Sequence, residues 1–334
     1  MKIKEKVLIT GVTGFVGSHM ADYIIEKKFN VELYGLKRWH LSNLKYVKHI
    51  INKIKLVDCD ITDPIGTRNM INKVNPDTIF HCAAESFVSP SWDHPTRYMN
   101  VNYNGTLNIL DSLKEKKSKA IFHIPGSGEE YGEIYPKELP ISPETVLRPV
   151  NPYAVSKIAQ DLIGYVYHKS YGIKVIRTRA FNHEGPRREK VFGIPWYAYQ
   201  IALIENNLQK PLIKVGGIDD KRNFTHIKDM VEAYWLATRK CDPGELYLGG
   251  TETDEGNVFT FRQALTKLIR MSHVKNIKFK SVAEYTRPTS VPRLIAETKK
   301  FRKKTNWKAK ISFDQILVDT LEYWRKRVKE NNHL

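Results

Sequence analysis

The sequence predicts an α/β protein built on a doubly wound parallel sheet, with a smaller lobe toward the C-terminus. Short β-branched runs alternate with longer amphipathic stretches in the first half of the chain, and this rhythm is typical of parallel strands joined by helices. After residue 180 the rhythm loosens into pieces interrupted by proline and glycine. We therefore expect residues 1–180 to form the first unit and residues 181–334 to form mainly the second, with the two partly interwoven.

The individual elements follow from this alternation. The expected strands are the β-branched runs at residues 6–10, 31–35, 54–58, 77–82, 119–124 and 174–179. The expected crossover helices are the amphipathic stretches at 17–28, 64–74, 102–116 and 152–170. Further helices are expected in the second lobe near 194–208, 227–239 and 260–271.

Composition limits the class of protein. The chain has 334 residues, of which 41% are hydrophobic and 27% charged, and no apolar run approaches the roughly 18 residues of a membrane span. The N-terminal residues pass from charge directly into a strand-like run without a signal-peptide pattern, so we expect a cytoplasmic protein. The three cysteines are far apart and form no CxxC pair, which predicts neither a disulfide framework nor a metal site.

The formal net charge of +18 raises the question of a nucleic-acid partner. The basic residues, however, are spread along the chain or gathered near its end, at residues 299–304 and 324–329, without an RNA-binding or zinc-finger pattern. This distribution favours solvated basic faces over a nucleic-acid site. A small polyanion could use part of the excess charge.

A glycine-rich turn follows the first expected strand. "LITGVTGFVGSHMADYII" places Gly11, Gly14 and Gly17 between this strand and an amphipathic helix, with Phe15 and Val16 inside the turn. Glycines at this place allow a tight turn and let backbone N–H groups approach a pyrophosphate at the helix N-terminus. The pattern predicts a Rossmann-type dinucleotide site.

The end of the second expected strand indicates which dinucleotide is bound. Sites for NAD usually have an acidic residue there, whereas this chain has Lys37 and Arg38. A guanidinium suits the 2′-phosphate of NADP, so NADP is favoured over NAD, although the two cations could also be ordinary exposed residues. Asp60 and Ile61, after the third strand, are expected to border the adenine.

Two groups of residues suggest catalysis. "NPYAVSK" places Tyr153 and Lys157 four residues apart at the start of a helix that Asn151 can cap, so the lysine lies near the phenol and is expected to favour the phenolate. The alternative is an amphipathic helix with a solvent-reaching lysine. "GSGEEYG" places Ser127, Glu129 and Glu130 in a turn at the end of a strand, where the alternative is a solvated turn.

These motifs together resemble those of the extended short-chain dehydrogenase/reductase family. The resemblance rests on "TGVTGFVG", "AAES", "VNYNGT", "GSGEEYG" and "YAVSK" and covers nearly the whole chain. "RAFNHEGPRR", "KVGGIDDKRNF" and "RPTSVPRL" are similar to the branch that contains GDP-mannose 4,6-dehydratases and GDP-4-keto-6-deoxymannose reductases. The resemblance implies a buried Asn102 behind the nicotinamide pocket, Ala83 and Ala84 beside the cofactor, and Ser86 beside the substrate.

The resemblance also implies roles for the catalytic residues. Tyr153 would take the proton of the sugar 4-hydroxyl, Ser127 would hydrogen-bond the same oxygen, and Lys157 would bind the nicotinamide ribose. Glu129 occupies the position of the base that removes the C5 proton in a dehydratase. Glu130 is expected to be structural.

Substrate contacts and assembly are further implications of the resemblance. A GDP-linked hexose is the implied substrate, with a homodimer or homotetramer built on the helices 102–116 and 152–170. Ser290 replaces a family acid that contacts the nucleotide ribose, which leaves the nucleotide open. The residues expected to bind the nucleotide sugar, besides Ser86, are Asn182, Arg187, Arg222 and Arg287.

The exact reaction remains open between alternatives. Gly128 stands where dehydratases of this branch usually carry a residue that could help to protonate the leaving group, and the segment 211–237 is similar to reductases, whereas "HEGPRR" is similar to dehydratases. We favour a lyase, the dehydratase, over the reductase or another epimerase/reductase of the family. A non-catalytic NADP sensor is the remote alternative, disfavoured because Tyr153 and Lys157 are both present.

Overall fold

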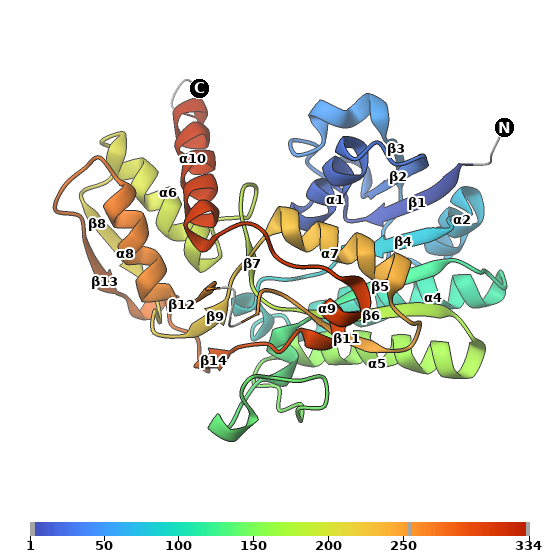
Figure 1. The fold of residues 1–334 in the computed structure, drawn as a ribbon. Coiled ribbons are helices and arrows are strands. Elements are labelled where there is room, and N and C mark those ends of the chain that lie inside the picture. Colours follow the sequence, from blue (N-terminus) through green and yellow to red (C-terminus); the bar gives the residue numbers. More distant parts are fainter. Residues whose placement is uncertain (1–3, 253–255, 332–334) are drawn as a thin grey trace.

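A computed structural model of the chain describes residues 4–252 and 256–331. In this part, seven strands form one sheet in which every neighbouring pair is parallel (Figure 1). The predicted doubly wound parallel sheet is therefore confirmed. In sheet order the strands are β11 (Leu246–Gly249), β6 (Lys174–Ala180), β5 (Ile121–Ser127), β4 (Thr78–His81), β1 (Glu5–Thr10), β2 (Val31–Lys37) and β3 (Lys55–Asp58).

Helices cover both faces of the sheet because successive side chains of a strand point to opposite faces. Val7 and Ile9 of β1 pack in one core with α1 (Phe15–Glu26) and α7 (Ile227–Lys240). Leu8, between them in sequence, packs in the core of the other face. That face is covered by α2 (Pro64–Val74), α4 (Gly105–Glu115) and α5 (Pro152–Tyr171).

The helix α4 continues a run of helical residues that begins at Pro95. The short α3 (Pro95–Tyr98) is followed by a π-helical segment, Met99–Asn104, and then by α4. A π-helical segment inside a helix is frequent at functional sites, and here it contains the buried Asn102.

The second unit has a core of its own. It is made of α6 (Gly193–Glu205), α8 (Phe261–Met271) and α10 (Phe313–Asn331), packed with β8 (Leu212–Val215). The exposed strand β13 (Lys278–Ser281) pairs with β8. The strands β12 (Val258–Thr260), β9 (Lys221–Asn223) and β14 (Arg293–Leu294) pair with one another between this core and the main sheet (Figure 1).

The observed elements agree closely with the predicted ones. Each predicted strand and helix is present with its ends shifted by a few residues, the helix expected at 102–116 being π-helical in its first turn. The elements that the sequence analysis did not predict include β11, α10 and α9 (Lys299–Thr305), and the strands β8, β9, β12, β13 and β14 of the second unit. In the described ranges, none of the helices combines the length and the apolarity that crossing a membrane requires.

Candidate active site

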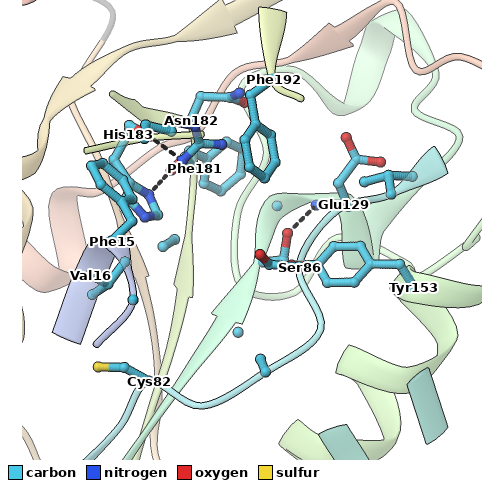
Figure 2. A pocket seen from close by; sticks show the side chains of 18 of the residues that line it. Phe15, Val16, Cys82, Ser86, Glu129, Tyr153, Phe181, Asn182, His183 and Phe192 are labelled. Atoms are coloured by element: carbon cyan, nitrogen blue, oxygen red, sulfur yellow. Dashed lines mark hydrogen bonds between the residues drawn. The ribbon is translucent and has the colours of Figure 1, made fainter. Parts of the chain in front are cut away.

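A cavity of about 390 Å³ opens at the carboxyl ends of the central strands. Ligands of parallel α/β sheets bind at this edge. Figure 2 shows Glu129 and Tyr153 on one side of the cavity and Phe15, Asn182 and His183 on the other. The predicted site residues that line it are Gly11, Gly14, Phe15, Val16, Gly17, Ala84, Ser86, Ser127, Glu129, Tyr153, Asn182 and Arg287.

The glycine turn forms one wall of this cavity, and its tight conformation requires residues without a Cβ at positions 11 and 17. Gly11 has φ +64°, and a Cβ there would lie 2.8 Å from the backbone nitrogen of Ala83. A Cβ on Gly17 would lie 2.3 Å from the carbonyl oxygen of Gly11. Gly14 directly precedes α1, so the N-terminus of this helix faces the cavity with free backbone N–H groups.

A second cavity, of about 310 Å³, continues from the first around the same turn and shares Gly11, Gly14 and Ala84 with it. Arg38 is exposed at its rim, whereas the ammonium of Lys37 is paired with the carboxylate of Asp58. The predicted cofactor residues that line it are Gly11, Gly14, Lys37, Arg38, Asp60, Ile61, Ala83 and Ala84. The shared residues place the two cavities next to each other around the glycine turn, and we refer to them together as the channel.

Gly105 and Asn102 support this channel from behind. A Cβ on Gly105 would lie 2.6 Å from Ile61, so the glycine of "NGT" allows α4 to pack against the wall of the second cavity. Asn102 is fully buried, and its amide bonds both the N–H and the carbonyl of Glu85 and the hydroxyl of Ser156, which precedes Lys157. This side chain therefore ties the loop after β4 to α5.

Tyr153 stands at the start of α5, where Asn151 caps the helix by accepting a hydrogen bond from the N–H of Ala154 at 2.8 Å. The Tyr153 side chain forms a hydrogen bond with Ser127, at the end of β5. Burial raises the pKa of Tyr153 above its ordinary value, and the Ser127 hydrogen bond offsets only part of this effect. The expectation that the Tyr153 pKa is lowered is therefore wrong for this structure.

The orientation of Lys157 explains this result. Its ammonium lies beneath the cavity and donates to the carbonyl oxygen of Pro125 at 2.7 Å and to the side-chain carbonyl of Gln160. Burial lowers the pKa of Lys157 to about 8, against the opposing effects of Glu130 and Asp161. The structure does not bring Lys157 into direct hydrogen bonding with the phenol.

Glu129 points into the cavity from the turn after β5 (Figure 2). Its carboxylate accepts a hydrogen bond from the side-chain N–H of Asn151 at 3.1 Å. Since the same Asn151 caps α5, one side chain fixes both the start of the Tyr153 helix and the position of Glu129.

Glu130 takes the opposite direction and is fully buried. It accepts from the backbone N–H of Ser127 at 2.7 Å and from Arg179 at 2.6 Å. Arg179 also donates to Asp161 at 2.7 Å, and Asp161 accepts two further bonds from Arg177. The alternative of a solvated turn therefore does not hold at Glu130.

Three predicted residues lie outside both cavity linings. Besides Lys157, Arg222 is buried and lies 3.3 Å from Asp220, although its charge interacts with that of Glu129. Arg187 has φ +71°, and its guanidinium contacts Asp22 at 2.7 Å, on α1. The structure therefore holds Arg187 on α1 and does not place it at the predicted substrate position.

The neighbouring Arg188 lines the cavity instead and was missed by the sequence analysis. Its guanidinium lies over the rings of Phe192, 4.0 Å from the centroid, and of Phe15, at 5.4 Å, and it contacts the buried Glu184 at 3.1 Å. The two arginines of "HEGPRR" are adjacent in sequence, but the direction of each side chain depends on the positive φ at Arg187. His183 and Phe192 also line the cavity without having been predicted.

Metal ligands are not gathered in this region. Among residues 4–252 and 256–331, three or more His, Cys, Asp or Glu side chains do not come together in a group that could hold a metal ion.

Comparison with known proteins gives matches over nearly the full length. The family model described as GDP-mannose 4,6 dehydratase matches residues 8–320. A GDP-6-deoxy-D-mannose reductase from Pseudomonas aeruginosa is 28% identical over 326 residues, which cover 98% of this chain and 99% of that protein. A human GDP-mannose 4,6 dehydratase is 27% identical over 340 residues, covering 95% of this chain and 90% of that protein.

Solved structures show the same arrangement. The structure of RMD from Pseudomonas aeruginosa complexed with NADPH superposes with a TM-score of 0.81 at 26% identity and covers 97% of this chain and 100% of that one. A dTDP-glucose 4,6-dehydratase from Bacillus anthracis in complex with NAD has a TM-score of 0.83 at 24% identity, covering 97% of this chain and 98% of that one. This similarity shows that the two proteins share a fold.

Proposed function

Because the chain belongs to the GDP-mannose 4,6-dehydratase family of extended short-chain dehydrogenases/reductases, we propose that it is an NADP-dependent nucleotide-sugar 4,6-dehydratase. The proposed reaction converts GDP-mannose into GDP-4-keto-6-deoxymannose. The family resemblance inferred from the motifs is confirmed by the match over residues 8–320. The choice of reaction within the family rests on the site.

The channel fits a dinucleotide. The turn needs glycine at 11 and 17 because a Cβ there would collide with neighbouring backbone. The N-terminus of α1 would hold the pyrophosphate, and Arg38 would hold a 2′-phosphate. The RMD structure complexed with NADPH supports NADP over NAD. When bound, the cofactor would accept a hydride from sugar C4 and return it to C6, so the reaction has no net redox change.

The phenol, the hydroxyl and the ammonium would act together on the 4-hydroxyl. Tyr153 takes its proton, and Ser127, already hydrogen-bonded to Tyr153, stabilises the same oxygen. Burial raises the Tyr153 pKa, so the phenolate needs a hydrogen-bond donor and positive charge around it. Ser127 supplies the former, and Arg188 is a positive charge that already acts on Tyr153. Lys157, one helical turn along α5, would act through the nicotinamide ribose that it binds.

Glu129 would carry out the step that separates a dehydratase from a simple oxidoreductase. A ketone at C4 acidifies the proton at C5, and Glu129 removes it so that the 6-hydroxyl leaves as water. The single observation that carries the proposal is the position of this carboxylate, which faces the cavity with Tyr153 and is oriented by Asn151. A phenol and a hydroxyl suffice to reduce a ketone, whereas elimination also needs a base for the C5 proton, and Glu129 supplies a carboxylate at this place, although some reductases of the branch carry an acid there too.

Incubation of the protein with GDP-mannose and a catalytic amount of NADP tests the proposal. We expect a 4-keto-6-deoxy sugar, identified by mass spectrometry, without net formation of NADPH. Unchanged GDP-mannose in the presence of bound NADP would refute it. A panel of GDP-, UDP-, CDP- and dTDP-sugars would identify the nucleotide.

A reductase is the second candidate, and one observation favours it. Gly128 has no side chain that could protonate the leaving hydroxyl, and a Cβ there would lie in tight contact with the ring of Phe181, at 3.1 Å. A reductase does not need that donor. This candidate predicts no reaction with GDP-mannose and one NADPH consumed for each 4-keto sugar.

We further propose a homodimer formed through α5. Val155, Leu162 and Val166 lie seven and four residues apart, which places them on one helix face, and each is 45–46% exposed. An apolar stripe of this kind is typical of a helix that packs against a partner. Light scattering coupled to gel filtration should give twice the mass of the chain, and Leu162→Glu should give the monomer.

A further inference from the structure

A chain of buried hydrogen bonds runs from Lys157 to the wall of the second cavity. The Lys157 ammonium donates to the carbonyl oxygen of the Gln160 side chain, and the amide N–H of Gln160 donates to the hydroxyl of Thr106 at 2.7 Å. His81 connects Thr106, at 3.0 Å, with Thr10, at 2.9 Å. The hydroxyl of Thr10 accepts from the backbone N–H of Ala83 at 3.0 Å, and Ala83 lines the second cavity.

The hydroxyl of Thr106 determines the direction of these bonds. It has one proton, and it donates this proton to the backbone carbonyl of Asn102 at 2.7 Å, which can only accept. Its two lone pairs must therefore receive N–H groups from Gln160 and His81. The amide nitrogen of Gln160 is thereby assigned to Thr106, and its carbonyl oxygen is turned toward Lys157.

His81 has a single compatible protonation state. Its Nε2 must carry a proton to donate to Thr106, and its Nδ1 accepts from Thr10. Burial lowers the pKa of His81 to about 3, which keeps the ring neutral in this tautomer. Every bond of the chain therefore has one direction.

We propose that Gln160 is a positioning residue that holds Lys157 as an ammonium ion, oriented under the catalytic tyrosine by the chain through Thr106 and His81. The inference rests on the proposed function in one respect, because it assumes that the charge of Lys157 is used in turnover. The orientation of the Lys157 ammonium depends only on residues of the protein itself.

Lys157 needs such a partner because it is buried. Only 4% of the residue is exposed, and burial lowers its pKa to about 8. A further decrease of this pKa would remove the charge at neutral pH. Two of its three N–H groups are engaged by Pro125 and Gln160. The titratable groups whose charges act on Lys157, or are acted on by it, are Glu130, Asp161, Cys82, His81 and His123. Gln160 is the uncharged group that accepts directly from the ammonium through its side chain.

The test is the titration of Lys157 by NMR in protein labelled with ¹³C at the lysine side chains. The Lys157 signal is identified by its loss in Lys157→Met. Gln160→Leu removes the carbonyl acceptor while keeping an apolar side chain of similar size. We expect the titration midpoint to fall by about one to two pH units, the equivalent of one hydrogen bond to a charged group. We also expect kcat at pH 7 to fall about twofold to tenfold, because a midpoint lowered from about 8 to between about 7 and 6 leaves about a half to a tenth of Lys157 charged, with KM for the nucleotide sugar changed less than about twofold.

A second variant tests the opposite direction. Gln160→Glu keeps an oxygen acceptor and adds a negative charge beside the ammonium, so it should raise the midpoint above that of the wild type. Gln200→Leu is the matched control. Gln200 is a buried helical glutamine of the second unit, and its side chain bonds the backbone of Lys214. This control should lower stability without moving the Lys157 midpoint.

Two outcomes would overturn the inference. One is a folded Gln160→Leu protein with the wild-type midpoint. The other, which decides the matter if Gln160→Leu does not fold, is a Gln160→Glu protein whose midpoint is unchanged or lowered. The titration needs no substrate, so it gives an answer even if the proposed reaction is not observed.

Discussion

The buried ion pairs beneath the active site allow a quantitative prediction for Asp161→Asn. Asp161 is 2% exposed and accepts two hydrogen bonds from Arg177, at 2.5 and 3.0 Å, and one from Arg179, at 2.7 Å. Asparagine keeps one acceptor but turns an N–H₂ group toward a guanidinium. Of the two buried arginines, Arg179 would keep the carboxylate of Glu130, whereas Arg177 would lose the carboxylate with which it is paired.

The expected cost is the penalty for breaking a buried charge pair, about 3–5 kcal/mol of the free energy of unfolding. Arg177 would keep one acceptor, the carbonyl of Gly244 at 3.0 Å, and Arg179 would keep Glu130, so we expect a value near the lower end of this range. Urea unfolding followed by tryptophan fluorescence measures it. Because natural proteins are stable by only about 5–15 kcal/mol, the shift of the midpoint should be large.

Asp219→Asn provides the matched control. Asp219 accepts from Arg262 in a similar paired geometry, at 2.6 and 2.9 Å, but its side chain is 73% exposed. This variant should unfold at the wild-type midpoint within experimental error. Equal shifts for the two variants would refute the argument that burial makes the Asp161 cluster important.

Three further predictions concern the reaction, the cofactor and pH. Glu129→Gln should slow elimination about 10²- to 10⁴-fold while still oxidising C4, so stoichiometric NADP should give lasting NADPH absorbance; normal dehydration would show that another group is the base. Gly17→Ala should weaken NADPH binding at least about tenfold in fluorescence titrations, since its Cβ would collide with the carbonyl of Gly11. The control Gly217→Ala, with open space around position 217, should bind NADPH normally, and equal affinities of the two variants would contradict a cofactor site at the glycine turn. Burial lowers the pKa values of four histidines in the folded protein, so their contribution to stability is present above the unfolded pKa of 6.5 and is lost as the pH falls toward 4. The free energy of unfolding should therefore decrease by up to about 1.4 kcal/mol per pH unit for each of them, and a flat profile between about pH 6.5 and 5 would exclude this. The histidines concerned are His19, His81, His123 and His183.

Local sequence patterns were sufficient where one segment determines its own structure. The glycine turn, the helix cap at Asn151 and the alternation of strands and helices were all predicted, because each depends on neighbouring residues or on period. The strand β11 was missed, since it has only four residues, ends in Gly249 and is followed by Gly250, and so carries little periodic signal.

Directions of side chains could not be predicted in the same way. Arg187 and Arg188 are adjacent, yet a positive φ turns the first toward α1 and leaves the second in the cavity. Arg179, the partner of Glu130, is 49 residues away in sequence. Gln160, which accepts from Lys157, is oriented by Thr106 of another helix. Such choices depend on contacts that form only when distant segments fold together.

The strand β11 also limits how this enzyme can be divided. It pairs with β6 at the edge of the main sheet, and α7, just before it, covers one face of that sheet. A fragment ending at residue 180 would leave the β6 edge unpaired and the apolar side chains of that face in water. Exchanging substrate specificity between relatives should therefore succeed only when residues 227–249 are inherited together with the dinucleotide-binding half.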